Sequence, residues 1–167
     1  MDLIVLKESL GAYMNINGSF LKMEGFSKLD SSSGVESYTR KYLSAEQKST
    51  DITGTQEKIS YTFDRMKNNC VHDVLALIAD GGKTGESCNR EIVLVDFSEQ
   101  QDGKFHAVKQ RFAVLCKDKR PENGFLDYSG EFVANGEKIF GYVTLSDDCK
   151  TVEFTEQRRG ILCDSNL

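Results

Sequence analysis

The side chains with the greatest chemical potential in this 167-residue sequence are two histidines, His72 and His106, and five cysteines. Cys70 and His72 are close in sequence, but residues at i and i+2 of a helix point to different sides. A thiol nucleophile needs its base within hydrogen-bond reach, so we do not expect this pair to be a catalytic dyad. His106 has no partner visible in the sequence. Isolated histidines without an acidic cluster argue against a metal site, and we predict no catalytic or metal-binding residues.

The cysteines are widely spaced and odd in number, and no C-x-x-C pair occurs among them. This pattern supports neither a zinc knuckle nor a thioredoxin-like motif. A disulfide framework is not expected in a protein that is not exported. We expect free, mostly buried thiols at Cys70, Cys88, Cys116, Cys149 and Cys163.

The segment Gly81-Gly82-Lys83-Thr84 resembles the end of a phosphate-binding loop. That loop needs a glycine five residues before the second of these glycines, and it lies between a strand and a helix. Here the helical pattern precedes the glycines, so a helix stop is the better interpretation. The acidic pairs Asp147-Asp148 and Glu153/Glu156 fall at turns and strand ends, where solvated charge is expected rather than acid–base chemistry. No cofactor is predicted.

Length and charge limit the class of protein. A chain of 167 residues fits one domain with a core of its own. The net charge of −5 argues against gripping nucleic acid through its phosphates, although nucleic acid could pass without sticking. The longest apolar run is far below the roughly 20 residues that span a bilayer, so no membrane partner is expected. Residues 1–8 lack the features of a signal peptide, which predicts synthesis and retention in the cytoplasm.

One stretch has clear helical periodicity, and it predicts a helix at about residues 69–80. Val71, Val74, Leu75 and Ile78 form an apolar stripe at i, i+3, i+4 and i+7. Asn68 or Asn69 can cap its start, and the two glycines at 81–82 can end it. We expect the stripe to pack against a sheet and to belong to the fold core.

Most of the remaining chain alternates as β-strand. Asn17-Gly18 predicts a tight hairpin turn, and the apolar run 91–97 predicts a central strand. Residues 126–133 and 138–145 predict a second hairpin, and 119–124 a charged loop around Pro121. The predicted fold is mainly β (α+β), a β-sandwich or half-barrel with one flanking helix and a long projecting loop at about 31–55. We assign a single domain, 1–167, with an N-terminal arm at 1–12 and a C-terminal tail at 157–167.

The polar segment 31–55 is too hydrophilic to enter a core and alternates too regularly to be a simple linker. Tyr38, Arg40 and Tyr42 share one face of it, and such residues could stack on bases. Neighbouring Glu36 and the acidic net charge favour a contact between subunits instead, because Tyr and Arg are enriched at interfaces. A segment rich in Ser, Thr, Lys and Glu cannot order alone, but it could order against neighbouring copies.

The order of these pieces resembles that of the major tail (tail tube) proteins of bacteriophages and of phage-tail-like particles of Gram-positive bacteria. The resemblance spans roughly residues 15–156 and lies in the combination of segments rather than in one motif. Those segments are YTRKYLSAEQKSTDITG, EKISYTFDR, NNCVHDVL, REIVLVDF, GKFHAVKQRFAVLCKD and LDYSGEFVANGEKIFGYVT.

The resemblance implies a structural subunit without catalysis, six copies of which close a ring by joining sheets edge to edge. Rings stack into a hollow tail tube through which DNA or an effector passes. The implied location is a virion tail or phage-tail-like particle, and the implied further partners are sheath, terminator, tape-measure or baseplate proteins. The family includes contractile, non-contractile and DNA-free tails. The residues expected at inter-subunit contacts are Tyr38, Arg40, Lys41, Tyr42, Lys48 and Asp51.

A second hypothesis from another class is a monomeric β-barrel that binds a small apolar ligand or a lipid. The sheet faces contain enough Phe and Val to line a cavity. Few polar anchors converge on one face, however, and the long polar segment would have no purpose in such a protein.

Overall fold

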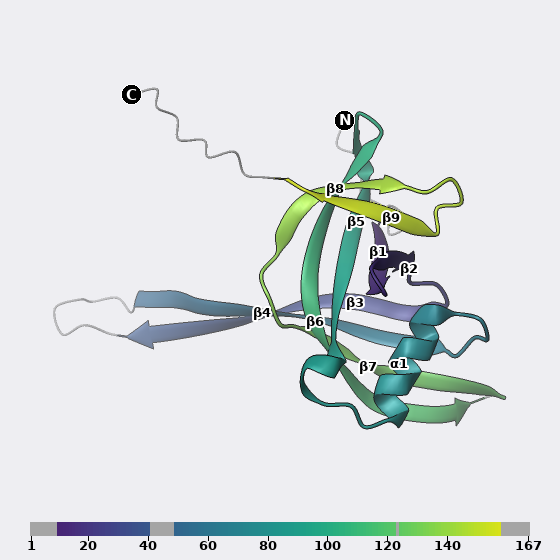
Figure 1. The fold of residues 1–167 in the computed structure, drawn as a ribbon. Coiled ribbons are helices and arrows are strands. Elements are labelled where there is room, and N and C mark those ends of the chain that lie inside the picture. Colours follow the sequence, from purple (N-terminus) through teal and green to yellow (C-terminus); the bar gives the residue numbers. More distant parts are fainter. Residues whose placement is uncertain (1–9, 41–48, 123, 158–167) are drawn as a thin grey trace.

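The computed structural model describes residues 10–40, 49–122 and 124–157. This part of the chain forms one nine-stranded sheet, one α-helix and one 3-10 turn (Figure 1). The mainly-β fold with a single flanking helix is confirmed. The elements are β1 (Leu10–Ile16), β2 (Ser19–Lys22), β3 (Phe26–Arg40), β4 (Ser49–Asp64), α1 (Cys70–Asp80), η2 (Gly85–Cys88), β5 (Asn89–Gln101), β6 (Lys104–Glu122), β7 (Phe125–Ala134), β8 (Ile139–Leu145) and β9 (Thr151–Glu156).

Six of the strands close into a barrel, and three extend from it. The order is β3-β4-β7-β6-β5-β1-β2-β9-β8, and an additional β6–β8 pairing joins the last strand back to β6. The closed circuit is therefore β6-β5-β1-β2-β9-β8. The extension β7-β4-β3 grows from the C-terminal half of β6, because that strand is 19 residues long and outlasts its barrel partners.

The barrel interior is packed with side chains. Alternation along each strand sends Tyr13, Val93 and Val95 inward, and their neighbours Met14 and Ile92 to the other face. Aromatic residues that are partly buried fill the remaining barrel space. The inward cluster is Tyr13, Val93, Val95, Ala107, Val143 and Val152, with Phe20, Phe97, Phe105, Leu145 and Phe154 packed against it.

A second core lies between α1 and the sheet that continues from the barrel wall into the extension. Val71, Leu75 and Ile78 are buried in it and Val74 is partly buried, so the predicted stripe is confirmed. Stacked aromatic rings form its floor, among them Tyr61, Phe63, Tyr128 and Phe132. Tight packing here depends on a missing side chain, because a Cβ at Gly130 would meet the Leu115 carbonyl oxygen and the Tyr61 hydroxyl.

The ends of α1 follow the predicted signals. The Asn69 side chain accepts hydrogen bonds from the backbone N–H groups of Val71 and His72, at 3.1 and 3.2 Å. At the other end Gly81 keeps a right-handed φ of −82°, and Gly82 takes the left-handed φ of +58° that stops the helix. Within the described part of the chain, no helix combines the length and apolar character that crossing a membrane requires.

Two sequence predictions about the C-terminal half are wrong. Residues 126–145 do not form a hairpin, because β7 and β8 pair with the same strand, β6, one after the other: Ala134 opposes Phe112, and Ile139 opposes Lys109. The chain therefore continues along β6 rather than reversing. Asn135 N–H donates to the Arg111 carbonyl at 2.9 Å, which holds the connection against β6.

Pro121 lies in β6 rather than in a loop. It opposes Leu126 of β7, while the last pairing of β5 with β6 ends at Ala113. At position 121 the strand is thus paired on one side only within the described residues, and proline is tolerated where its missing N–H would face no partner strand.

The predicted turn at Asn17-Gly18 is confirmed by positive φ values of 52° and 90°.

Candidate assembly surfaces

The two histidines have structural surroundings. His72 is fully buried; its Nδ1 accepts the Met66 backbone N–H at 3.1 Å, and its Nε2 lies 2.7 Å from the Glu24 carbonyl oxygen. These bonds place the proton on Nε2, which donates to Glu24, and leave neither nitrogen to act as a base. Burial lowers the pKa of His72, so the neutral ring is favoured. Cys70 is exposed and free, and the predicted absence of a Cys–His dyad agrees with this geometry.

The other candidates for chemistry are dispersed. His106 packs near the rings of Phe140 and Tyr142. Asp148 accepts hydrogen bonds from the Ser146 hydroxyl and the Lys150 backbone, so it shapes a turn. Among described residues, no three His, Cys, Asp or Glu side chains are grouped to hold a metal. The four described cysteines are free, but Cys70 and Cys149 are exposed, so the expectation of mostly buried thiols is wrong; Cys163 lies outside the described residues.

The outer edge of β3 is the first surface suited to assembly. β3 stands at the end of the strand order, and within the described residues it pairs only with β4. It is 15 residues long and contains no proline, and residues 30–34 are exposed. Monomeric proteins usually shorten, charge or cover such an edge, since unpaired N–H and C=O groups recruit another strand. β3 carries four charged residues, but no other described strand pairs with its outer edge, which leaves that edge available to a strand of another molecule.

The second surface is the end of the β3–β4 hairpin, which replaces the predicted loop at 31–55. β7 pairs with β4 only from Lys58 onward, so the part of the hairpin before it projects from the sheet (Figure 1). From Ser49 to Glu57 this overhang is about 26 Å long at the usual strand rise. The prediction of a loop here is therefore wrong. β3 and β4 pair with each other along this segment, and each strand supplies hydrogen-bond partners for the backbone of the other.

The predicted contact residues fall on this overhang or outside the described residues. Tyr38 and Arg40 lie in β3 and Asp51 in β4. The register brings Tyr38 directly opposite Asp51, a juxtaposition that sequence spacing did not reveal. Lys41, Tyr42 and Lys48 lie outside the described residues.

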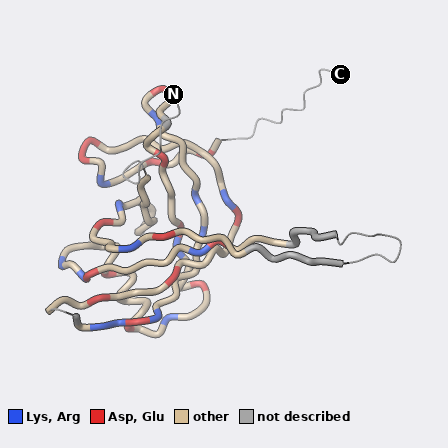
Figure 2. Tube along the Cα trace, turned by 180° about the vertical axis from the view of Figure 1, so that it is seen from behind, with Lys and Arg blue, Asp and Glu red and all other residues tan. Residues whose placement is uncertain are grey.

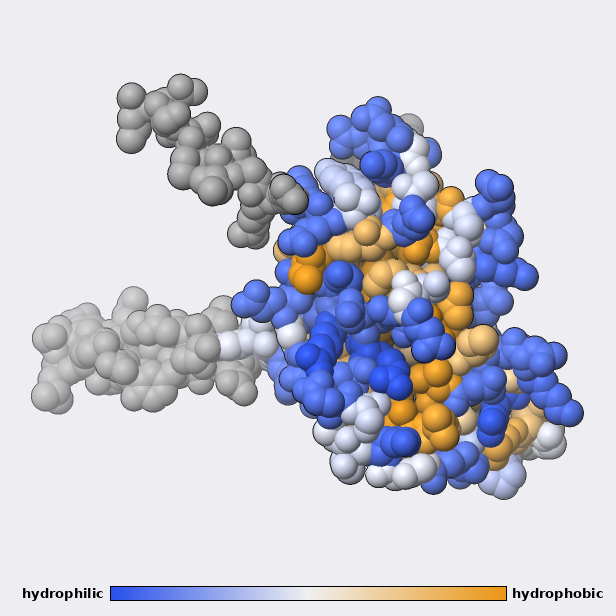
Figure 3. Space-filling view, viewed as in Figure 1, coloured by the Kyte–Doolittle hydropathy of each residue, from blue (hydrophilic) through white to orange (hydrophobic). Residues whose placement is uncertain are grey.

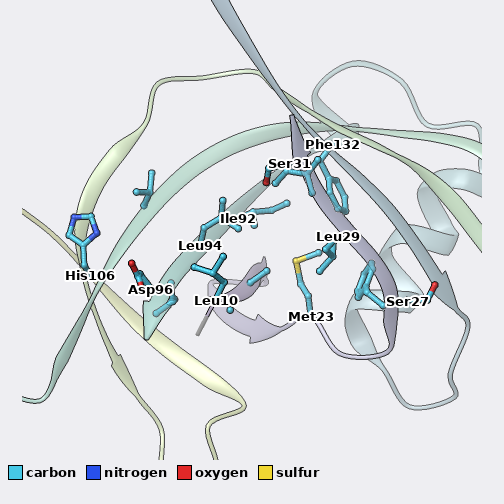
Figure 4. A pocket seen from close by; sticks show the side chains of 16 residues that line it. Leu10, Met23, Ser27, Leu29, Ser31, Ile92, Leu94, Asp96, His106 and Phe132 are labelled. Atoms are coloured by element: carbon cyan, nitrogen blue, oxygen red, sulfur yellow. The ribbon is translucent and has the colours of Figure 1, made fainter. Parts of the chain in front are cut away.

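The third surface is an apolar groove of about 480 Å³ that sequence analysis missed (Figure 4). It lies between the outer wall of the barrel, formed by β1, β5 and β6, and the start of β3 with parts of β4 and β7. One wall carries Leu10, Leu94 and Val108, and the other Phe26 and Leu29. A signal did exist: residues 92–95 are apolar on both faces of the strand, which is typical of a sheet covered on both sides.

Charged and exposed apolar side chains are distributed over the rest of the surface. Basic and acidic residues are interspersed over the described chain (Figure 2), and several form ion pairs, such as Lys119–Asp80 at 2.9 Å and Lys117–Glu131 at 2.8 Å. Apolar residues gather in a band on the face shown in Figure 3. Among the residues that the structure describes, the exposed large apolar side chains are Leu10, Met66, Leu77, Leu115, Phe125 and Phe140.

Comparison with known proteins gives matches in structure alone. No protein-family model and no curated protein sequence matches the chain. The SPP1 tail tube is similar with a TM-score of 0.65 and 10% identity, over 82% of this chain and 78% of that one. A chain of the virion of a native gene transfer agent particle is similar with a TM-score of 0.58 and 15% identity, over 81% of this chain and 97% of that one.

A chain of the sixfold-symmetrised baseplate of the anti-feeding prophage is also similar, with a TM-score of 0.53 and 9% identity, over 84% of this chain and 97% of that one. At such identities the likeness establishes the fold. This chain has the fold of the phage tail tube proteins, as the resemblance in its sequence implied.

Proposed function

We propose that this protein is the non-catalytic subunit of the tail tube of a phage or a phage-tail-like particle. Six copies close a ring, and rings stack into a hollow conduit for DNA or an effector. The observation that carries the proposal is the 15-residue outer edge of β3, unpaired within the described residues and continuous with the overhanging hairpin. The similarity to the SPP1 tail tube supports it, and the tail of an empty gene transfer agent particle, another similar structure, has C6 symmetry.

A ring needs one heterologous contact repeated around an axis, in which an edge of one copy meets a different edge of the next. β3 supplies one such edge. The C-terminal part of β6 is a second candidate, because from Val114 to Glu122 it pairs within the described residues only with β7. Repeating the contact removes unpaired edges from the closed ring, as closure does in a barrel. The overhang, with Tyr38, Arg40 and Asp51, reaches beyond its own subunit and contacts adjacent copies or the next ring.

The same proposal sets the location and the partners. The protein is synthesised in the host cytoplasm and resides in the tail of the particle. The ends of the tube meet terminator, tape-measure or baseplate proteins, and a sheath surrounds it where the tail contracts. DNA is a passenger in the lumen, which fits a chain of net charge −5 better than it fits a DNA-gripping protein.

The alternative of a barrel that holds a small apolar ligand is less well supported. The interior of the closed barrel is occupied by Tyr13, Val93, Val95 and their phenylalanine neighbours. The apolar groove lies outside the barrel wall and opens beside Leu10 at its rim. A lipid-binding barrel would instead enclose its ligand within the strands.

Sedimentation velocity over a concentration series tests the proposal. We expect monomers at low concentration and species of at least six copies at high concentration, because edge pairing between copies follows mass action. A single monomeric boundary at all concentrations and at several salt concentrations would contradict it. Retention of a small apolar ligand by that monomer would instead support the barrel alternative.

A further inference from the structure

The apolar groove defined above is too large and too open to be a packing defect. Core packing rarely leaves voids larger than one water molecule, whereas this groove has a volume of about 480 Å³. Figure 4 shows side chains from both walls pointing into it, among them Leu10, Leu29 and Leu94. Its few polar groups include Ser27, Ser31, Asp96 and His106. Water in such a site finds few hydrogen-bond partners, so an apolar occupant is favoured.

The chain has such an occupant directly before the rim of the groove. Leu10, the first described residue, lines the groove and is 61% exposed. The residues ahead of it read Met1-Asp2-Leu3-Ile4-Val5-Leu6-Lys7-Glu8-Ser9. Four consecutive large apolar residues, 3–6, are thus separated from the rim by three polar ones. Leaving the apolar side chains of such a segment in water is unfavourable compared with burying them.

Length and charge fit the same placement. Along β5 the groove is lined from Ile92 to Asp96, about 13 Å at the strand rise. By the same measure an extended chain covers about 10 Å from Leu3 to Leu6, so the segment fits within the lined length. Leu10 opposes Asp96 in the sheet register, so Lys7, three residues earlier, can bring its ammonium group near that carboxylate. The short tether gives the segment a millimolar effective concentration at its own groove.

We propose that Leu3–Leu6 of each molecule occupies that molecule's own groove, with Lys7 beside Asp96, and so covers the apolar wall that α1 leaves open. This placement requires the chain to reverse between Leu6 and Leu10. This inference does not rest on ring formation, because it concerns one copy alone. Its failure would leave the tail tube proposal intact.

Photo-crosslinking tests the proposal in the full-length protein. Ile4 is replaced by p-benzoylphenylalanine, ¹⁵N-labelled and unlabelled protein are mixed at a concentration where sedimentation shows monomers, and the crosslinked peptides are identified by mass spectrometry. We expect crosslinks to Leu29, Leu94 or Val108 that join peptides of the same isotopic label. Mixed-label crosslinks, or crosslinks only outside the groove, would overturn the proposal. The control carries the same probe at Ile161 and should not label the groove.

Dye binding provides a second readout. In one variant Leu3, Ile4, Val5 and Leu6 are all changed to Ser, and in the matched control Ile161 and Leu162 are changed to Ser. The proposal expects the first variant to bind 1-anilinonaphthalene-8-sulfonate with several-fold higher fluorescence than the wild type, and the control to match the wild type. Equal fluorescence in all three proteins would overturn it. Strong wild-type fluorescence that the first variant does not exceed would mean that the groove is open to small apolar ligands.

Discussion

His72 illustrates how a residue that could do chemistry is instead committed to the fold. Both of its ring nitrogens are used by backbone groups: the Met66 N–H donates to Nδ1, and Nε2 donates to the Glu24 carbonyl. The ring also stacks on Phe63, with the ring centroids 4.5 Å apart. It thereby fixes the chain before α1 to the segment that joins β2 to β3. Protonation would remove the acceptor at Nδ1 and bury a charge.

The lowered pKa of His72 predicts a pH dependence of stability. The folded-state pKa lies below the value of about 6.5 expected for the unfolded chain. The unfolded state therefore binds the proton first as the pH falls, and stability present above pH 6.5 is lost below it. We expect the unfolding midpoint in urea to decline less steeply from pH 7.5 to pH 5 in His72→Gln than in the wild type.

The control for this comparison is Cys70→Ser, an exposed position on the same helix, which should decline as the wild type does. The charged residues near His72, which are Asp64, Arg65 and Asp73, are the same in all three proteins. Parallel declines in the wild type and His72→Gln would show that the histidine is not the titrating group.

Gly130 makes a second residue-scale prediction. The Tyr61 hydroxyl reaches the Leu115 carbonyl at 3.1 Å across this glycine, and a Cβ there would collide with both. We expect Gly130→Ala to lower the free energy of unfolding by about 1–3 kcal/mol, the usual cost of overpacking a core. Denaturant unfolding monitored by circular dichroism measures the change.

The matched control is Gly34→Ala, in an exposed part of β3 where an added Cβ meets nothing closer than the Gln56 carbonyl oxygen at 3.5 Å. That change should be neutral or slightly stabilising, because alanine restricts the unfolded chain. Equal destabilisation by the two substitutions would indicate that the close packing at Gly130 is misassigned.

At the scale of elements, α1 is held to the sheet by one face and by its C-terminal end. Asp80 accepts hydrogen bonds from Lys119 Nζ at 2.9 Å and the Tyr128 hydroxyl at 3.1 Å, which ties the helix end to β6 and β7. The bond from Lys119 is the main reason that the pKa of Asp80 is lowered. It also offsets the unfavourable position of a carboxylate at the negative end of the helix dipole.

Two leucines on α1 separate burial from helix propensity. Leu75 is 1% exposed and Leu77 is 62% exposed, yet both are in the middle of the same helix. Leu75→Ala should destabilise the fold by about 2–5 kcal/mol through lost burial and a cavity. Leu77→Ala should change stability by less than about 0.5 kcal/mol. An unchanged unfolding midpoint for Leu75→Ala would contradict the packing described.

The β3–β4 overhang predicts that folding and assembly can be separated. Deleting residues 44–52 removes the start of β4, which pairs with the end of β3 but not with β7, since β7 pairs with β4 only from Lys58. We expect the deletion variant to remain a folded monomer that forms no long tubes. Thermal unfolding and electron microscopy of the same sample measure the two properties. A collapse of the thermal transition, or tubes of normal length, would contradict this role.

Local signals in the sequence predicted α1, the turn at Asn17-Gly18 and the central strand, because each is determined by neighbouring residues. Sequence spacing did not predict that β7 and β8 follow one another along β6, since the turn at residues 134–137 specifies a bend and not its partner strand. Nor did it predict the groove, which exists because strands distant in sequence approach and α1 covers only part of the space. The composition of the polar segment suggested that the predicted contact residues lie on a projecting part of the chain. That Tyr38 lies opposite Asp51 follows only from the strand register.

At the scale of the whole molecule, the barrel and the space under α1 are each filled by a cluster of buried side chains, and β3 with its overhang remains unpaired on one side within the described residues. Under the tail tube proposal, stability rests mainly on the two cores, to which the start of β3 contributes Phe26 and Leu29, and assembly rests on the outer edge of β3 and the overhang. Substitutions in the cores should alter unfolding, and changes along β3 should alter the size of the assembly. This division is what a subunit needs if it is to remain monomeric until others join it.

The most direct measurement is negative-stain electron microscopy of the purified protein over a range of concentrations and salts. Edge pairing through β3 predicts hollow cylinders of uniform width, built from stacked rings that lengthen as the concentration rises. Particles that remain single and compact under every condition would contradict the claim that neighbouring copies pair with this edge.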